Sequence, residues 1–403
     1  MNDLTDAPAQ TSTTGDIFRA FLKLGLTSFG GPVAHLGYFR DEFVIRRRWL
    51  SEESYADLVA LCQFLPGPAS SQVGFALGMR RGGVKGALAA WTAFTLPSAL
   101  FLLLFALSAD AFAGGIGQSL IHGLKLVAVA VVAQAVWGMA RNLCPDRQRA
   151  GIALVAVILT AALPSAFGQI GVIALGAGAG LLLCGHAQRK AEEHRPVEFP
   201  HGKSYVALAT FFLLLLILPA LTLSTGSNAL ALFEAFYRAG ALVFGGGHVV
   251  LPLLEASVVD TGWVSANSFI AGYGAAQAVP GPLFTFAAYL GASVSLTPNA
   301  LLGAVISLIA IFLPGMLLVI AVLPHWDRFR QQSRAQAAMA GANAAVVGLL
   351  GSALYHPVWT SSVLSPRDFA VALTAFCLLT IWKLAPWKVV VATTIAGAWI
   401  YYL

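Results

Sequence analysis

The chain has 403 residues, of which 58% are hydrophobic and only 10% charged, and its mean hydropathy is +0.77. An average soluble domain carries about 25% charged residues. The composition excludes a soluble enzyme, a nucleic-acid-binding protein and a secreted disulfide scaffold, and apolar runs of membrane-spanning length recur along the chain. Because the 24 Lys and Arg residues are spread over short loops, we expect a lipid bilayer around the protein and no nucleic-acid partner.

Neither a metal site nor a cofactor site is predicted. The four cysteines lie far apart and form no CxxC pair, which indicates scattered reduced thiols: Cys62, Cys144, Cys184 and Cys377. Residues 1–16 are polar and acidic and contain no basic segment. We therefore expect a short disordered tail there and not a cleaved signal peptide.

Hydrophobic runs predict nine full-length apolar helices. They cover residues 84–107, 119–140, 150–167, 169–185, 204–223, 298–323, 336–356, 368–382 and 388–402. Lys and Arg mark loops that stay in the cytoplasm, and this rule places both the N-terminus and the basic segment 186–203 inside. The loops at 108–118 and 357–366 contain no Lys or Arg and are predicted outside.

Two stretches are too short in each arm for a simple span. Residues 52–80 begin and end next to basic runs and are interrupted by Pro66-Gly67-Pro68, which leaves about 13 residues, or roughly 20 Å of helix, in each arm. A proline cannot continue a helix interior. The pattern predicts a re-entrant hairpin of two half-helices, and residues 17–48 are predicted to break similarly at Gly30-Gly31-Pro32.

The patterns of the first half return in the second half. Gln63-Phe64-Leu65-Pro66-Gly67-Pro68 matches Gln277-Ala278-Val279-Pro280-Gly281-Pro282, and Phe29-Gly30-Gly31 matches Phe244-Gly245-Gly246. The series predicts one duplicated unit. Its expected division is a first membrane repeat at 17–185, a basic cytoplasmic loop with a linking helix at 186–231, and a second membrane repeat at 232–403.

Charge predicts that the two repeats are inverted. Residues 40–85 hold seven Lys and Arg, whereas residues 249–300 hold none, so the two hairpins are expected to open on opposite faces of the membrane. The predicted fold is an all-α polytopic membrane protein with two inverted-topology repeats, each with broken helices followed by about four transmembrane helices. Inverted repeats with broken helices are the architecture of secondary transporters. A duplication kept for packing alone is the alternative.

Each Pro-Gly-Pro break starts a new half-helix, and this predicts an anion site. The first N–H groups of a helix have no partner within it, and its positive end attracts anions. Hydroxyl groups follow each break, from Ser70 and Ser71 in the first copy and from Thr285 in the second. The alternative is that the breaks only kink packed helices and the hydroxyls cap them.

Basic residues within apolar segments are a second group of candidates, because they are costly there. Lys23 and Arg238 occupy matching positions before the two Phe-Gly-Gly turns and would suit a dianion, unless each side chain extends to its interface. Lys125 is a weaker candidate, since Asn343 takes its place in the second copy.

Titratable and amide side chains also recur. His35 and Glu42 stand seven residues apart, as do His248 and Glu255, so each pair is expected to share a helix face and to couple or gate transport. Glu42 would otherwise pair with nearby Arg46, and the histidines would be structural donors. The amides that precede the breaks would bind the ligand or fasten the hairpins: Gln63 and Gln277.

These blocks resemble the long-chain, two-repeat type of the chromate ion transporter family. The resemblance rests on Phe29-Gly30-Gly31-Pro32 with Ala34-His35, Leu65-Pro66-Gly67-Pro68, Phe244-Gly245-Gly246-Gly247-His248 and Val279-Pro280-Gly281-Pro282. It implies chromate export across the bacterial inner membrane and chromate resistance, with sulfate as a look-alike competitor. The second copy departs from the first by Gly247 in place of Pro32.

Three classes of function remain at this point. A secondary exporter accounts for inversion, broken helices and embedded cations together, whereas an anion channel would differ only in its kinetics. An intramembrane enzyme is not expected, because the sequence has no HExxH motif and no phosphate-binding loop of the GxxxxGK[ST] type. Selectivity between chromate and sulfate, proton coupling and a homodimer are left open.

Overall fold

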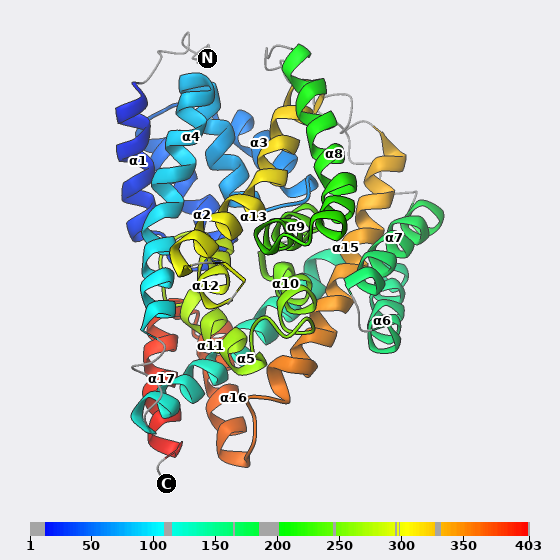
Figure 1. Cartoon of the computed structure of the whole chain (residues 1–403). Coiled ribbons are helices and arrows are strands. Elements are labelled where there is room, and N and C mark those ends of the chain that lie inside the picture. Colours follow the sequence, from blue (N-terminus) through cyan, green and yellow to red (C-terminus); the bar gives the residue numbers. More distant parts are fainter. Residues whose placement is uncertain are drawn as a thin grey trace.

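The predicted all-α class is confirmed. The computed structural model describes residues 13–108, 115–163, 166–184, 201–244, 247–294, 296–297, 299–326 and 332–401, and within these ranges the regular structure is helical with no strand. Figure 1 shows the helices as a bundle in which α1 and α17, the first and last labelled helices, lie toward opposite poles.

The described residues of the first repeat form seven α-helices and a π-helical turn. In chain order they are α1 (Thr14–Thr27), α2 (Gly31–Phe39), the turn η1 (Arg40–Arg46), α3 (Glu52–Phe64), α4 (Ala69–Leu107), α5 (Gly115–Leu143), α6 (Arg147–Ala162) and α7 (Ala166–Leu183). The break expected in residues 17–48 is present between α1 and α2, and the one expected in 52–80 separates α3 from α4.

The second half begins with the linking helix and repeats this order with more short turns. It comprises α8 (His201–Thr225), α9 (Asn228–Ala241), η3 (Gly247–Val249), α10 (Val250–Val258), α11 (Ala266–Ala276), η4 (Leu283–Thr285), α12 (Phe286–Ser293), α13 (Ala300–Val322), η5 (Leu323–His325), α15 (Ser333–Ala353), η6 (Leu354–Trp359), α16 (Pro366–Thr380) and α17 (Pro386–Tyr401).

Each of the nine predicted spans coincides with a helix, although the boundaries differ. Five helices of the described residues are long and apolar enough to cross a membrane by themselves, and α6, α16 and α17 are shorter. Helix α1 begins at Thr14, because the Thr13 hydroxyl accepts the N–H of Asp16 and caps the helix. Residues 14–16, which were expected in the N-terminal tail, therefore belong to this helix. Residues 1–12 and 185–200 lie outside the described part of the chain.

Helix α4 is two helices joined by a sharp turn. Gly82 and Gly83 have non-helical backbone angles, which separate a first arm at 69–81 from a second arm at 84–107. A Cβ atom at Gly78 would overlap the carbonyl of Gly86, so the two arms pack backbone against backbone. In the second repeat, Gly291 of α12 meets Gly303 of α13 in the same way.

Equivalent residues begin and pack equivalent helices, which supports the duplication. Ser51 caps the N–H of Ser54 at the start of α3, and Ser265 caps the N–H of Ser268 at the start of α11. Helix α1 crosses the second arm of α4 at Gly25. Helix α9 crosses α13 at Gly240, where a side chain would overlap the carbonyl of Ile311.

The two repeats are intertwined. The second arm of α4 runs toward the pole that carries the C-terminus, and α13 runs the opposite way (Figure 1). Trp326, just beyond α13, donates a hydrogen bond to Asp57 of α3 at 3.2 Å. Phe105, near the end of α4, stacks on Tyr289 of α12 at 5.6 Å. Each long span therefore ends beside the hairpin of the other repeat.

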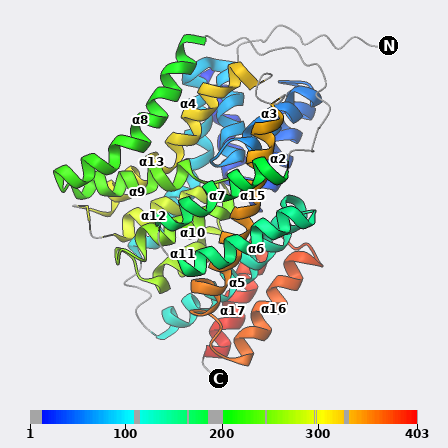
Figure 2. The ribbon, with the colours of Figure 1, turned by 90° about the vertical axis from the view of Figure 1, so that its right-hand side faces the viewer.

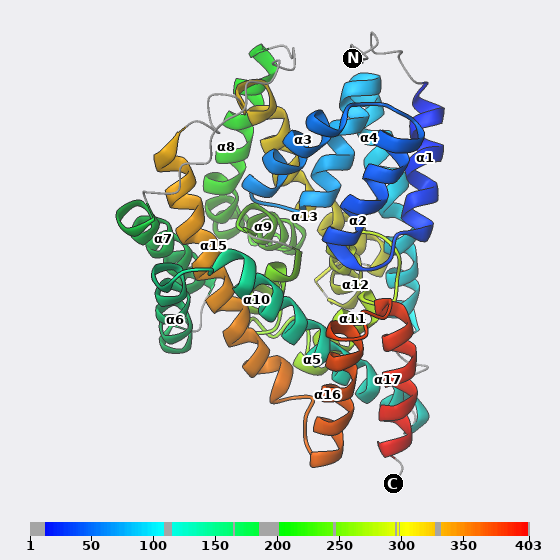
Figure 3. The same ribbon diagram turned by 180° about the vertical axis from the view of Figure 1, so that it is seen from behind.

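The remaining helices lie around the hairpins and the long spans α4 and α13. Helices α16 and α17 lie beside α5 at the pole away from the N-terminus (Figures 1 and 3). Helix α8 lies along one edge of the molecule in the rotated view of Figure 2. Only 17% of the most apolar stretch of this helix is buried, and the side chains of Phe212, Leu216 and Leu223 are exposed. A water-soluble protein rarely exposes so large an apolar surface, so lipid is its natural cover.

Candidate functional site

The two Pro-Gly-Pro loops are held by a reciprocal pair of backbone hydrogen bonds between the repeats. The N–H of Gly67 donates to the carbonyl of Val243 at 2.7 Å, and the N–H of Gly281 donates to the carbonyl of Ser28 at 2.9 Å. Both glycines have positive φ, 124° and 108°, which side-chain-bearing residues adopt only with strain. Each repeat thus inserts its loop beside the residue that precedes the glycine turn of the other.

Each loop also lies against the long span of the opposite repeat. A Cβ atom at Gly67 would lie 3.2 Å from the Cα of Gly315 in α13, and one at Gly281 would lie 2.7 Å from the hydroxyl of Ser98 in α4. Gln72 donates its side-chain amide to the carbonyls of Pro66 and Gly315, at 2.9 and 3.2 Å. The breaks are therefore interior, inter-repeat contacts, as irregular backbone within a membrane requires.

The predicted donors after the breaks differ between the repeats. Ser70 and Ser71 are buried in the first turn of α4, where Pro68 provides no side-chain cap. After Pro282 the chain instead forms the tight turn η4. Both the N–H and the hydroxyl of Thr285 are bonded to the carbonyl of Pro282, at 3.0 and 2.7 Å.

Both predicted histidines are buried or partly buried and hydrogen-bonded. His35 Nε2 lies 3.2 Å from the carbonyl of Ser28, and its Nδ1 lies 3.4 Å from the hydroxyl of Ser70. His248 Nδ1 lies 2.6 Å from the hydroxyl of Tyr273 in α11. His35 therefore links the end of α1 to the start of α4.

The predicted carboxylates lie in different surroundings. Glu42 is buried in η1 and contacts Arg47, Arg46 and Lys23, at 2.6, 3.2 and 3.8 Å. The ion pair with Arg46 that the sequence left as the alternative is present, and Arg47 and Lys23 join it. Glu255 is half-buried near the end of α10. A coupling role for these pairs stays a prediction.

The two matched cations are ion-paired within their own repeats. Lys23 is exposed on α1 and its ammonium lies 3.8 Å from Glu42. Arg238 is half-buried on α9 and lies 3.2 Å from Glu234, one turn away. Because each already has a carboxylate partner, a role of either cation in binding the anion stays a prediction.

Lys125 is buried and belongs to a separate polar cluster at the far end of α11. Its ammonium donates to the side-chain oxygen of Asn267, at 2.9 Å, in the first turn of α11. One turn earlier on α5, His122 Nε2 lies 2.7 Å from the carboxylate of Asp368 in α16. About 14 Å of α11 separates Asn267 from the loop at Pro280.

The other predicted residues take up supporting or outlying positions. Gly30 has a positive φ at the start of α2, and Gly31 is the first residue of that helix. Gln63 is exposed at the end of α3, whereas Gln277 is half-buried and its amide nitrogen has no partner among the described residues. Gly245 and Gly246 lie outside the described residues.

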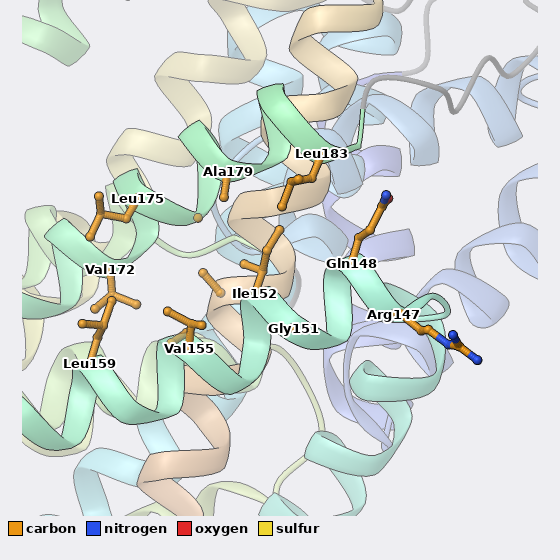
Figure 4. Close-up of a pocket in the computed structure, with 13 residues that line it drawn as sticks. Arg147, Gln148, Gly151, Ile152, Val155, Leu159, Val172, Leu175, Ala179 and Leu183 are labelled. Atoms are coloured by element: carbon orange, nitrogen blue, oxygen red, sulfur yellow. The ribbon is translucent and has the colours of Figure 1, made fainter.

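A pocket of about 540 Å³ lies away from these loops, between α6, α7 and α15. Figure 4 shows that its walls are apolar side chains such as Ile152 and Leu175, and that Arg147 points away from them. Such a lining offers a dianion almost no hydrogen-bond donors, so the inter-repeat loops remain the candidate site.

Sequence reasoning missed polar residues both at the Pro-Gly-Pro loops and in the separate cluster around Lys125. Ser28, Gln72 and Ser98 contact the loops, and His122 and Asp368 accompany Lys125. Ser28 carried a usable signal, because it directly precedes the Phe-Gly-Gly turn, but its counterpart is Val243, so a search for repeated residues passes over it.

Comparison with known proteins identifies the family. A family model described as chromate transporter matches residues 15–181 and 230–398. The chain belongs to the chromate transporter family. Both matched ranges agree with the two repeats, and the resemblance inferred from the glycine and Pro-Gly-Pro blocks is confirmed.

Relatives within the chromate transporter family match most of this chain. A probable chromate transport protein of Synechococcus elongatus is 31% identical over 375 residues, which cover 90% of this chain and 88% of the relative. A chromate transport protein of Pseudomonas aeruginosa is 29% identical over 86% of this chain and 82% of its own length. One from Cupriavidus metallidurans is 27% identical over 98% and 95%. No solved structure matches the chain.

Proposed function

We propose that the protein is a secondary transporter that exports chromate across the bacterial inner membrane and so confers chromate resistance. Family membership supports chromate as the transported ion. The observation that carries the transport mechanism is the reciprocal pair of bonds from Gly67 to Val243 and from Gly281 to Ser28, which joins two broken hairpins at one place. Broken helices that meet between repeats are where transporters of this architecture bind their substrates.

The repeats have inverted topology in this proposal, with the N-terminus in the cytoplasm. The opposite directions of the second arm of α4 and of α13 support it (Figure 1). The seven basic residues at 40–85 against none at 249–300 support it as well. Rocking of one repeat against the other about the shared loops would then expose the anion to alternate sides.

Export requires no coupled ion. With the cytoplasm negative, expelling a dianion is favoured by about 4.6 kcal/mol per 100 mV, twice the value for one charge. Uptake of the same ion would need a coupled cation, and proton coupling of export is optional. Sulfate has nearly the same shape and charge as chromate, so a site built from dipoles would bind it as a competitor.

Chromate flux in proteoliposomes tests this function. We expect saturable chromate movement toward the positive side of an imposed potential, faster as the potential rises, and competition by sulfate. Counterflow, in which unlabelled chromate on one side drives labelled chromate from the other, is expected of a transporter and not of a channel. Absence of protein-dependent chromate flux at any imposed potential or pH gradient would contradict the proposal.

Lys23 and Arg238 are expected to attract the anion through their field. Lys23→Ala and Arg238→Ala should each raise the KM for chromate flux by about two- to fivefold and leave membrane insertion intact. The effect of Lys23→Ala should shrink at high salt, because its exposed charge is screened. Lys85→Ala in the cytoplasmic turn of α4 is the control for a general loss of positive charge. Normal KM in both variants at low salt would remove these cations from the site.

A further inference from the structure

The region around the two Pro-Gly-Pro loops, here called the inter-repeat centre, carries chemically different side chains in the two repeats, although the segments correspond. Ser28 in the first repeat corresponds to Val243 in the second, Ser70 to Phe284 and Thr95 to Phe312. Phe284 and Phe312 contact each other, with ring centroids 5.7 Å apart. Two phenyl rings therefore fill the place where the first repeat has two small hydroxyl side chains.

Several hydroxyl groups of the first repeat are buried without a hydrogen-bond partner among the described residues. They are the side chains of Ser28, Ser71 and Thr95, with 0%, 4% and 1% exposure. A buried hydroxyl without a partner is costly, and such groups in folded proteins usually face a ligand or water. The second repeat also has buried hydroxyls without a partner among the described residues, at Ser307 and Ser362. At its break, however, the hydroxyl of Thr285, which corresponds to Ser71, is bonded to the carbonyl of Pro282.

Backbone donors show the same difference. Helix α4 starts as a regular α-helix, and its first bond within the helix is from the N–H of Gln72 to the carbonyl of Pro68, so three N–H groups precede it without a helical partner. In the second repeat η4 already uses the N–H of Thr285. The first repeat therefore presents more unpartnered hydroxyl and backbone donors at its break, whereas the second repeat keeps the amide nitrogen of Gln277.

His35 lies between the segments that carry these donors, and its ring also packs edge-on against Phe94, the neighbour of Thr95, with centroids 5.3 Å apart. Its Nε2 lies beside the carbonyl of Ser28 and its Nδ1 beside the hydroxyl of Ser70, which is next to Ser71 in the first turn of α4. A carbonyl only accepts, so Nε2 donates to the carbonyl of Ser28. The neutral ring then accepts at Nδ1, and the hydroxyl of Ser70 donates to it. Ser70 is therefore a positioning group, and Ser71 and Ser28 keep free hydroxyls.

We propose that the transported oxyanion is bound by the first repeat alone, at the start of α4, through the uncharged hydroxyl donors of Ser28, Ser71 and Thr95 and the N–H groups of the first turn. The phenyl rings of Phe284 and Phe312 close the equivalent place in the second repeat. This assignment rests on the proposed function and names its binding residues. The ligand class is a tetrahedral divalent oxyanion, chromate or sulfate.

Matched substitutions in the two repeats test the one-sided site. Ser28→Ala, Ser71→Ala and Thr95→Val should each weaken chromate binding to the detergent-solubilised full chain by about tenfold, because each removes a hydrogen bond to a charged ligand. Thr285→Val, the counterpart of Ser71→Ala, and Ser307→Ala, which removes a buried unpartnered hydroxyl of the second repeat, should change the affinity less than twofold. Binding is measured by the shift of the melting temperature with chromate and, separately, with sulfate, and flux is measured in proteoliposomes.

The melting temperature without anion separates a binding role from a structural one. Removing a buried hydroxyl that has no partner should leave that temperature unchanged or raise it, while the chromate-dependent shift is lost. Chromate affinity equal to wild type in the three first-repeat variants would overturn the one-sided site and leave the transporter proposal standing. An equal loss of chromate affinity in the second-repeat variants would also overturn the one-sided site. A wild-type protein that neither binds nor moves chromate would overturn both proposals.

Discussion

Replacing Pro66, Gly67 and Pro68 with alanine is expected to reduce chromate flux in proteoliposomes below about a tenth of the wild-type rate. Without the break, α3 could continue into the first arm of α4 as one helix of about 45 Å, longer than the ~30 Å membrane core. The N–H of Gly67 would then leave the carbonyl of Val243, and the start of α4 would no longer point into the protein. A binding site built on that start would be lost.

The single substitution Gly67→Ala should have a smaller effect in the same direction. Its φ of 124° is strained for alanine, and the new methyl group would lie 2.9 Å from the Gln72 amide. Gly138→Ala is the matched control, because this glycine lies within α5 and a Cβ atom there has no neighbour within 4 Å. Flux equal to wild type in the triple variant, with the protein inserted normally, would show that the break is not required.

The sequence predicted the breaks and the repeat because both leave local signals. Proline and glycine interrupt helices through their own backbone chemistry, so Pro66-Gly67-Pro68 and Pro280-Gly281-Pro282 mark the breaks without any knowledge of the tertiary structure. The matching helix-capping serines at Ser51 and Ser265 follow from the same duplication.

What the sequence could not show is which residues of different segments meet. The bond between Gly281 and Ser28 joins residues 253 positions apart, and no periodicity encodes it. Residues repeated in both halves point to Lys23 and Arg238, whereas Ser28, whose counterpart is Val243, gives no such signal. A site that one repeat keeps and the other has closed with aromatic rings appears only when the two halves are compared in space.

Asp368→Ala is expected to destabilise the folded protein by about 3 kcal/mol, the second large effect. The Asp368 carboxylate is buried, contacts His122 of α5 at 2.7 Å, and accepts the N–H of Leu364 and the hydroxyl of Ser365 at the start of α16. Its removal leaves the buried His122 ring without its partner, opens the start of α16 and takes a negative charge away from Lys125. The melting temperature of the detergent-solubilised protein should fall by several degrees.

Asp146→Ala is the matched control for this cluster. Asp146 also caps a helix, α6, and pairs with Arg149 at 2.6 Å, but its side chain is 43% exposed. An exposed pair contributes little, so this variant should shift the melting temperature much less than Asp368→Ala. Asp368→Asn keeps an oxygen for the cap but loses the charge, and should fall between the two. Equal small shifts in all three variants would mean that the buried contact between α5 and α16 contributes little to holding the C-terminal helices.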